Sequence, residues 1–266
     1  TYACSDFKFK KGLVSATKTS GHTLQIADGL WLDKKFKAAM MKSIAQSELD
    51  RKRFVYSDIG FILLEQVVEA VTGKTLDAYL VSEFYRPMGL EHTLFQPLNR
   101  YKKADIMPTA ANDYLRRQDL CGYVHDEAAA FMGGVSGNAG LFSTAQELGK
   151  IYQMILNEGE LDGKRYLRPE TCRIFTTEKS AVSHRGLGYD KPNLKDPKAN
   201  ACASSAPASV YGHTGFTGTC AWVDPENDLV YIFLSNRLCP DAWNGKLNSM
   251  KIRQAVQEVI YQSLYT

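Results

Sequence analysis

The sequence lacks both a long apolar run and an excess of one charge. No stretch approaches the roughly 18 apolar residues that a membrane-spanning helix needs, because residues 61–64 are followed at once by Glu65 and Gln66. Its 32 Lys and Arg residues nearly balance 29 Asp and Glu residues, for a net charge of +3, and the basic residues are scattered. We therefore expect no membrane span and no nucleic-acid-binding surface.

Spacings typical of metal and phosphate sites are also absent. The six cysteines lie far apart, with no Cys-x-x-Cys pair and no His at ligand spacing. Cys220 alternates with Ala221 and Trp222 in a strand-like run, which favours core packing over reactivity. The glycine-rich stretch 132–144 has no Gly-Lys-Ser or Gly-Lys-Thr to make a phosphate loop. We expect buried free thiols, no metal and no cofactor.

The length and composition fit one domain. With 266 residues, 44% of them hydrophobic, the chain can bury one large core, and we expect a single domain over residues 1–266. Residues 1–30 are polar and expected to be irregular. Residues 31–205 are expected to be mainly helical with long loops, and residues 206–266 to form antiparallel strands and a C-terminal helix. No apolar leader follows Thr1, so we interpret the start as a processed, truncated or fragment terminus.

Local signals predict several helices. Apolar residues recur with helical spacing over residues 36–44. A second apolar face covers residues 59–70, with Ser57 or Asp58 as its cap and Gly73 as its stop. Further helices are expected over residues 76–84 after Thr75, from Ser143 or Thr144 through 155, and over about 247–264, while the stretch 95–119 is expected to be an irregular loop.

The C-terminal part has the clearest strand pattern. Residues 220–223 and 229–234 are strand-like runs separated by a turn-forming segment, which predicts an antiparallel hairpin. His213-Thr214-Gly215 comes just before them. A glycine beside a polar pair lets a substrate backbone approach closely, because no Cβ intervenes. This pattern indicates an active-site strand.

Two motifs together resemble those of a known superfamily. Tyr56-Ser57-Asp58 at a helix start and His213-Thr214-Gly215 on a strand are similar to the Tyr/Ser-x-Asn and Lys-Thr-Gly motifs of the serine β-lactamases and penicillin-binding proteins. The order of elements resembles that family over about residues 45–264. The resemblance implies an α+β fold of the β-lactamase/transpeptidase type, N-terminally incomplete. The chain looks most similar to serine-hydrolase domains that are fused C-terminal to a glycoside hydrolase.

The resemblance assigns expected roles to six residues. Tyr56 matches a tyrosine that relays the serine proton, although a phenol is a poor base without partners; otherwise it is a structural tyrosine before a helix. His213, Thr214 and Gly215 are expected to align the substrate, and the Phe216 N–H to form half of an oxyanion hole. Asp58 either orients a lysine, contacts a substrate amide or caps the helix.

His213 stands where the family more often has lysine. Because imidazole titrates near neutrality, recognition of a substrate carboxylate is expected to be pH-dependent or weaker. Members with His here include peptidases and esterases, so the resemblance favours these over antibiotic hydrolysis. Asp58 in place of Asn, an acceptor only when ionised, also weakens a reading as an efficient β-lactamase.

The family's Ser-x-x-Lys nucleophile motif is not evident at the expected place. Ser5 with Lys8 and Ser15 with Lys18 fit the bare pattern, but both lie in a polar stretch close to Tyr56. We interpret both as chance matches and expect the nucleophile upstream of Thr1.

A second titratable cluster is His125-Asp126-Glu127. It could be a metal or acid/base site, or a polar loop near the cleft. His22, His92 and His184 are isolated and interpreted as ordinary polar histidines.

These observations lead to one functional hypothesis and one alternative. The parent protein is expected to be an extracytoplasmic serine hydrolase that acts by acyl transfer on a peptide, ester or β-lactam-like substrate, muropeptides above all, with this chain alone inactive. The alternative is an inactive binding or scaffold module attached to an enzyme such as a glycosidase. A Ser-x-x-Lys in the preceding sequence would favour the enzyme.

Overall fold

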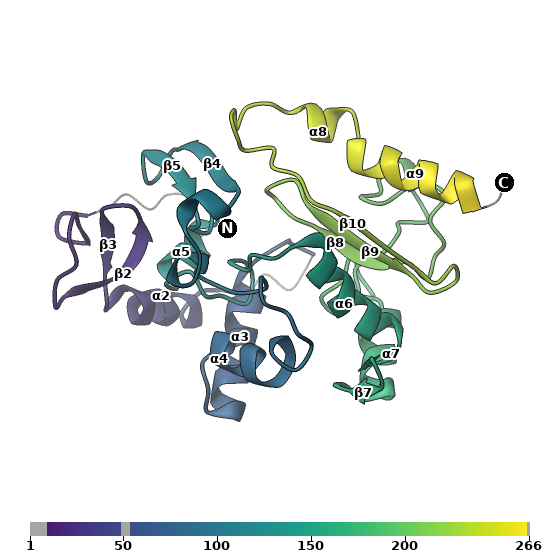
Figure 1. The fold of residues 1–266 in the computed structure, drawn as a ribbon, viewed down its shortest axis with the longest axis horizontal. Coiled ribbons are helices and arrows are strands. Elements are labelled where there is room, and N and C mark those ends of the chain that lie inside the picture. The colour runs from purple at the N-terminus through teal and green to yellow at the C-terminus, as the bar shows by residue number, and fades with distance from the viewer. Residues whose placement is uncertain (1–9, 49–53, 265–266) are drawn as a thin grey trace. The chain divides into compact units, whose positions relative to one another are not determined.

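The computed structural model describes residues 10–48 and 54–264. The chain divides into two compact units, Thr1–Phe142 and Ser143–Thr266, and each is described by itself. Figure 1 traces both along the chain. The prediction of one domain over residues 1–266 stays a prediction.

The first unit opens with an antiparallel sheet. Its strands are β1 (Val14–Ser15), β2 (His22–Ala27) and β3 (Leu30–Asp33), in the order β1-β3-β2. The expectation of an irregular segment over residues 1–30 was therefore wrong for β1 and β2. These strands are short and mostly half-exposed, and the hairpin buries Ile26, Ala27 and Leu32, so the sequence shows little apolar alternation.

Three helical segments follow. The predicted helices are confirmed as α2 (Phe36–Ala45) and α3 (Ile59–Thr72), and Gly73 ends α3 with a φ of +68°, a left-handed conformation that glycine adopts readily. The helix expected over residues 76–84 is shorter: α4 (Leu76–Leu80) continues as a π-helical turn, η1 (Val81–Tyr85).

The stretch that we expected to be irregular contains a hairpin. β4 (Pro108–Asp113) pairs with β5 (Gln118–Cys121), with two irregularities of register that obscure the alternation in the sequence. In the connecting turn the buried Arg116 side chain makes two hydrogen bonds of 2.8 Å to Asp113. Two short 3-10 turns, η2 (Pro97–Asn99) and η3 (Lys103–Asp105), precede this hairpin, and α5 (Glu127–Phe131) follows it. Phe131 packs on Phe36 of α2 in the core of this unit.

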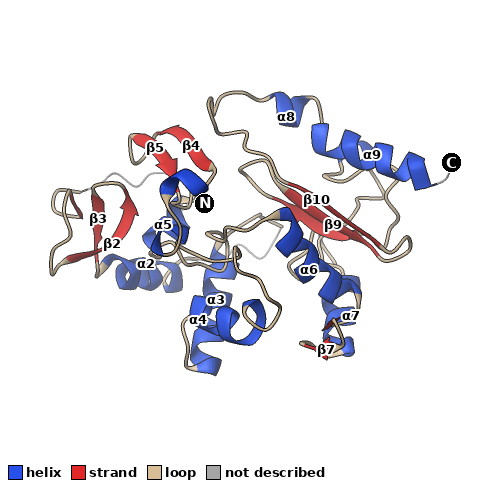
Figure 2. Ribbon diagram, viewed as in Figure 1, coloured by secondary structure: helices blue, strands red, loops and turns tan. Residues whose placement is uncertain are grey.

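The second unit is built on the predicted C-terminal hairpin. β9 (Cys220–Asp224) and β10 (Leu229–Phe233) pair in regular register, and β8 (Tyr211–Thr214) adds to β9, giving the order β10-β9-β8. The paired residues Trp222 and Tyr231 are buried with Val210 on one face, where Ile260 of α9 (Ile252–Leu264) packs on them. Figure 2 shows α9 and α6 (Ala145–Leu156) on opposite faces of this sheet.

The second unit contains further helices and short strands. Thr144 caps α6 by accepting a hydrogen bond of 3.3 Å from the Glu147 N–H, as one of the two predicted caps. The C-terminal helix is confirmed as α9, with the separate short helix α8 before it. The other elements are β6 (Glu160–Leu161), β7 (Lys164–Arg165), α7 (Pro169–Thr177), η4 (Pro197–Ala199) and α8 (Lys246–Ser249).

In the described residues the chain contains helices, and all of its paired strands are antiparallel. The fold is therefore of the α+β class, as predicted. Within residues 10–48 and 54–264, no helix is long and apolar enough to cross a membrane.

Candidate active site

The His-Thr-Gly motif lies on an edge strand. β8 pairs with β9 on one side, and on the other side Gly212 exchanges two main-chain hydrogen bonds with Asp190, of 2.7 and 3.1 Å. Main-chain groups alternate between the two sides of a strand, so Thr214 directs its N–H and C=O outward like Gly212. In the described part of the chain, pairing on this outer side stops at Gly212. The outer edge at Thr214 is therefore a place where an extended peptide could add.

Gly215 closes the turn that follows β8. Its N–H donates to Thr219 O at 2.8 Å, and Arg253 Nη1 donates to the same oxygen at 2.9 Å. A Cβ at Gly215 would overlap the Thr219 hydroxyl. The approach of Thr219 is thus one structural reason for glycine at this position, and the expected role of Gly215 in substrate approach stays a prediction.

Phe216, the expected oxyanion residue, is held by Arg237. The Arg237 Nε donates to Phe216 O at 2.6 Å, and its guanidinium lies 4.2 Å from the centre of the Phe216 ring, which is 66% exposed. These contacts hold the ring and the carbonyl of Phe216. The N–H matched to an oxyanion hole belongs to the preceding peptide, whose Gly215 O accepts from Arg253 Nη1 at 3.3 Å.

The His213 ring lies between a donor and an acceptor. Arg185 Nη1 is 2.8 Å from Nε2, and Thr214 O is 2.7 Å from Nδ1. A guanidinium only donates and a carbonyl only accepts, so a neutral ring with its proton on Nδ1 satisfies both. The guanidinium of Arg185 thus places a permanent positive charge beside the ring, and the expected role of His213 in recognising a carboxylate stays a prediction.

Arg185 is a site residue that sequence reasoning missed. Its Nη2 lies 3.5 Å from Asp190 Oδ2, and His184 Nε2 lies 2.9 Å from Asp190 Oδ1. The Asp190 side chain is 8% exposed, so the carboxylate anchors both neighbours from inside the unit. His184, interpreted as isolated, belongs to this cluster. Residues 181–210 have no regular sequence pattern that marks His184, Arg185 or Asp190 as site residues. These residues come close to β8 through the pairing of Asp190 with Gly212, which the sequence does not reveal.

Tyr56, Ser57 and Asp58 belong to the other unit. Tyr56 is 52% exposed and comes before α3. Asp58 occupies the cap position of α3 but its side chain makes no capping hydrogen bond, whereas Ser57 Oγ accepts from the Ile59 N–H at 3.3 Å. Of the readings of Asp58, a side-chain cap is wrong. The convergence of Tyr56, Asp58 and His213 on one cleft stays a prediction.

Of the two Ser-x-x-Lys matches, the structure describes only the one at Ser15 and Lys18. Ser5 and Lys8 lie outside the described residues. Ser15 lies on β1, where its Oγ accepts from the Thr17 N–H at 3.3 Å, and Lys18 Nζ lies 5.5 Å from the centre of the Trp31 ring. Ser15 is thus on a strand, and Lys18 contacts an aromatic ring. Both positions agree with the interpretation that this Ser-x-x-Lys pattern arose by chance.

The cluster at residues 125–127 has a structural role. Asp126 Oδ1 caps α5 by accepting from the Ala129 N–H at 2.7 Å and also accepts from Asn138 Nδ2 at 3.0 Å. Burial lowers the pKa of His125, which disfavours its charged form. Over the described positions, no three His, Cys, Asp or Glu side chains are grouped to hold a metal ion.

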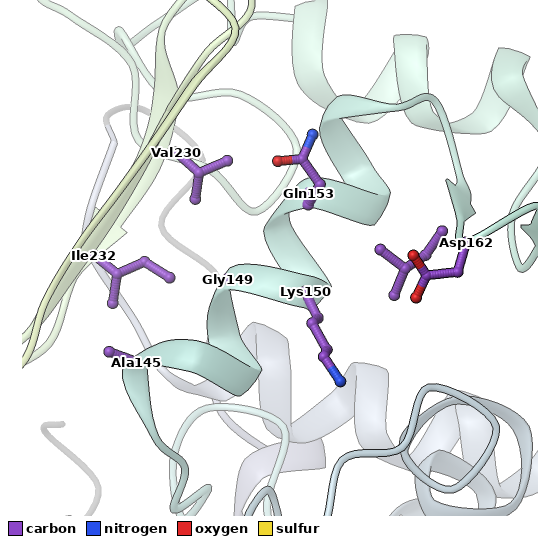
Figure 3. A pocket seen from close by; sticks show the side chains of 8 residues that line it. Ala145, Gly149, Lys150, Gln153, Asp162, Val230 and Ile232 are labelled. Carbon is purple, nitrogen blue, oxygen red and sulfur yellow. The ribbon is translucent and has the colours of Figure 1, made fainter.

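A cavity of the second unit lies away from β8. It has a volume of about 470 Å³ and is lined from α6, β10 and the β6–β7 turn; Figure 3 shows Lys150 and Asp162 at this site. None of the predicted site residues lines it, so we place the candidate chemistry at the β8 edge.

Comparison with known proteins agrees with the motifs. The family model for beta-lactamase matches residues 16–253. A putative D-alanyl-D-alanine carboxypeptidase of Escherichia coli K12 is 38% identical over 197 residues, which are 70% of this chain and 45% of that protein. A protein of the same description from Salmonella gallinarum is 32% identical over 227 residues, 80% of this chain and 52% of its own length. The chain spans about half the length of these relatives.

Solved structures share the fold. Simvastatin synthase from Aspergillus terreus superposes with a TM-score of 0.56 at 16% identity, covering 88% of this chain and 61% of that one. A penicillin-binding-protein homologue from Caulobacter crescentus gives 0.52 at 17% identity, covering 84% and 62%. The α+β fold is thus of the β-lactamase and penicillin-binding-protein type, and the chain belongs to the beta-lactamase family within the serine β-lactamase and penicillin-binding-protein superfamily.

Proposed function

We propose that this chain is part of a serine hydrolase that transfers an acyl group from a peptide ending in a carboxylate, as a D-alanyl-D-alanine carboxypeptidase does. The observation that carries the proposal is the outer edge of β8, where Thr214 directs its main chain outward beside the Arg185–His213 pair. A cell-wall peptide in an extracytoplasmic compartment fits this chemistry, and the names of the curated relatives support it.

The strand edge supplies binding. An extended peptide adds to an open edge through main-chain hydrogen bonds, and Thr214 has the orientation this needs. Arg185 supplies a charge that persists at every physiological pH, so it can attract a terminal carboxylate without protonation of His213.

The reaction follows from the expected roles. A serine hydroxyl attacks the peptide carbonyl carbon while its proton passes to Tyr56, which acts in this step as the phenolate, and the Phe216 N–H donates to the oxyanion. The C–N bond then breaks, the leaving amine takes the proton from Tyr56, and water releases the acyl group from the serine. The nucleophile is a serine other than Ser15.

The alternative is a binding or scaffold module, for example one attached to a glycoside hydrolase. It is favoured by one observation: within the described ranges, the Ser-x-x-Lys match at Ser15 lies on a strand.

Release of D-alanine from a peptide ending in D-alanyl-D-alanine tests the enzyme hypothesis, in the full-length protein that carries this chain. Tyr56→Phe is expected to lower kcat by about 10²- to 10⁴-fold, the contribution of a positioned proton relay. Tyr114→Phe, at another exposed tyrosine, is the matched control. Binding of the peptide without turnover would support the scaffold alternative, and an unaltered kcat in Tyr56→Phe would contradict the assigned relay.

A further inference from the structure

A second cavity lies wholly in the first unit. It has a volume of about 260 Å³, and its walls come from β2, β3, the η2 turn, residues 122–124 and residues 133–134. Pockets for drug-sized ligands measure about 300–1,000 Å³, so this one accommodates a ligand with a single ring.

Unusual backbone conformations shape its wall. Gly122, Gly133 and Gly134 have φ values of +77°, +93° and +86°, and a Cβ at Gly122 would overlap the Leu98 side chain. Gln96 has a φ of +48°, and its side-chain amide donates to Gly133 O. Non-glycine residues in this conformation are strained and concentrate at binding and catalytic sites.

The amide side chains of the lining offer both acceptors and donors. The Gln25 amide nitrogen donates to Ala27 O at 3.3 Å, and the Asn99 amide nitrogen donates to Gln96 Oε1 at 3.0 Å. Each of these amide nitrogens has a second N–H, and each amide oxygen accepts hydrogen bonds. The complementary ligand therefore carries several groups that both donate and accept, as hydroxyls do.

The rest of the lining is aromatic, aliphatic and nearly uncharged. The indole of Trp31 and the ring of Phe142 contribute flat apolar surface, and Lys18 is the one charged residue among those that line the cavity, all of them described. The absence of a carboxylate in the lining disfavours a cationic ligand. A sugar ring combines hydroxyl groups, which donate and accept, with an apolar C–H face, so it matches this lining.

We propose that this cavity binds one pyranose ring of an uncharged sugar. The ring hydroxyls donate to the oxygens of Gln25 and Asn99, and its C–H face lies against Trp31. This inference goes beyond the proposed function and does not rest on it, because the cavity is lined by none of the β8 residues.

Titration of the 266-residue chain with N-acetylglucosamine tests the proposal, read by tryptophan fluorescence and by ¹⁵N amide shifts. We expect saturable changes with a Kd on the order of 1 mM, as suits a small polar ligand, and shifts at Gly122, Gly133 and Gly134. Trp31→Ala is expected to weaken binding at least about tenfold, and Asn99→Ala about two- to tenfold.

Two matched variants serve as controls. Trp243→Ala removes a tryptophan that is 94% exposed, and Asn157→Ala removes an exposed asparagine at the end of α6; both are expected to bind as the unmodified chain does. If Trp31→Ala does not fold, the pair Asn99→Ala and Asn157→Ala decides. Unsaturable shifts, shifts confined to β8, or binding of glucuronate but not of N-acetylglucosamine would overturn the proposal.

Discussion

At the scale of single residues, the pair of Arg185 and His213 explains how a strand motif can lack lysine and still have a permanent cation beside it. The guanidinium donates to the imidazole, and Asp190 holds the guanidinium from the other side. The motif itself was predictable, since three consecutive residues carry it. The role of Arg185 was not predictable. Arg185 comes close to β8 because Asp190 pairs with Gly212, and these two residues are more than 20 positions apart in the sequence, with an irregular stretch between them.

The preference for a carboxylate is therefore expected to be independent of pH. In the full-length protein, the ratio of kcat/KM for a peptide ending in a carboxylate and for its amide analogue is expected to stay constant between about pH 5.5 and 8.5, because arginine keeps its charge there. Arg185→Gln is expected to lower that ratio about 10- to 100-fold, the value of a charged hydrogen bond. Arg168→Gln is the control. A ratio that rises as the pH falls would assign the charge to His213 instead.

Lys191 gives a stability prediction with a definite sign. Burial lowers the pKa of this amine from 10.5 to about 8, while its ammonium donates to Thr176 O at the end of α7. Between about pH 8 and 10.5 the unfolded chain binds more protons at this site than the folded chain, so its contribution to the free energy of unfolding increases with pH, by about 3 kcal/mol in total.

The comparison with Lys191→Met isolates this contribution, since buried cysteines and tyrosines titrate above about pH 9 in both proteins. Urea unfolding at several pH values is expected to show the free energy of the unmodified chain rising relative to that of Lys191→Met across the window. A constant difference would show that the amine has the same pKa in the folded and unfolded chains.

At the scale of elements, the sequence predicted those features that depend on a few neighbouring residues, namely helix ends, helix caps and a hairpin. Gly73 ends α3, Thr144 caps α6, and the hairpin of β9 and β10 follows its apolar runs. The sheet of β1 to β3 and the hairpin of β4 and β5 were missed, because their strands are short, partly polar and irregular in register. The sheet of β1 to β3 packs through Ile26 and Leu32 in one core with residues of α2 and α5, and periodicity along the chain does not reveal such packing.

The turn after β8 provides a test at this scale. Gly215→Ala is expected to lower the free energy of unfolding by about 1–3 kcal/mol, because the new Cβ overlaps the Thr219 hydroxyl. The double variant with Thr219→Ala is expected to recover part of this loss, since the overlapping group is gone. Urea unfolding of the two single variants and the double variant measures the coupling. Strict additivity would show that the overlap is not the cause.

At the scale of the whole molecule, family membership and the α+β class were predictable from two motifs and their order. The division into two compact units was not, because nothing in the sequence between Phe142 and Ser143 marks a linker: this boundary falls inside a motif-like stretch that leads directly into α6.

The last prediction concerns covalent chemistry of the 266-residue chain by itself. We expect no acyl-enzyme, because Ser15 lies on a strand with Lys18 placed against Trp31, whereas a serine nucleophile needs a base within hydrogen-bond reach. Intact-mass measurement after incubation with a fluorescent penicillin and with a fluorophosphonate checks this, and the full-length protein is the positive comparison. An adduct on the chain that peptide mapping assigns to Ser5 or Ser15 would make that serine the nucleophile. It would also show that the Ser-x-x-Lys pattern at that position is no chance match.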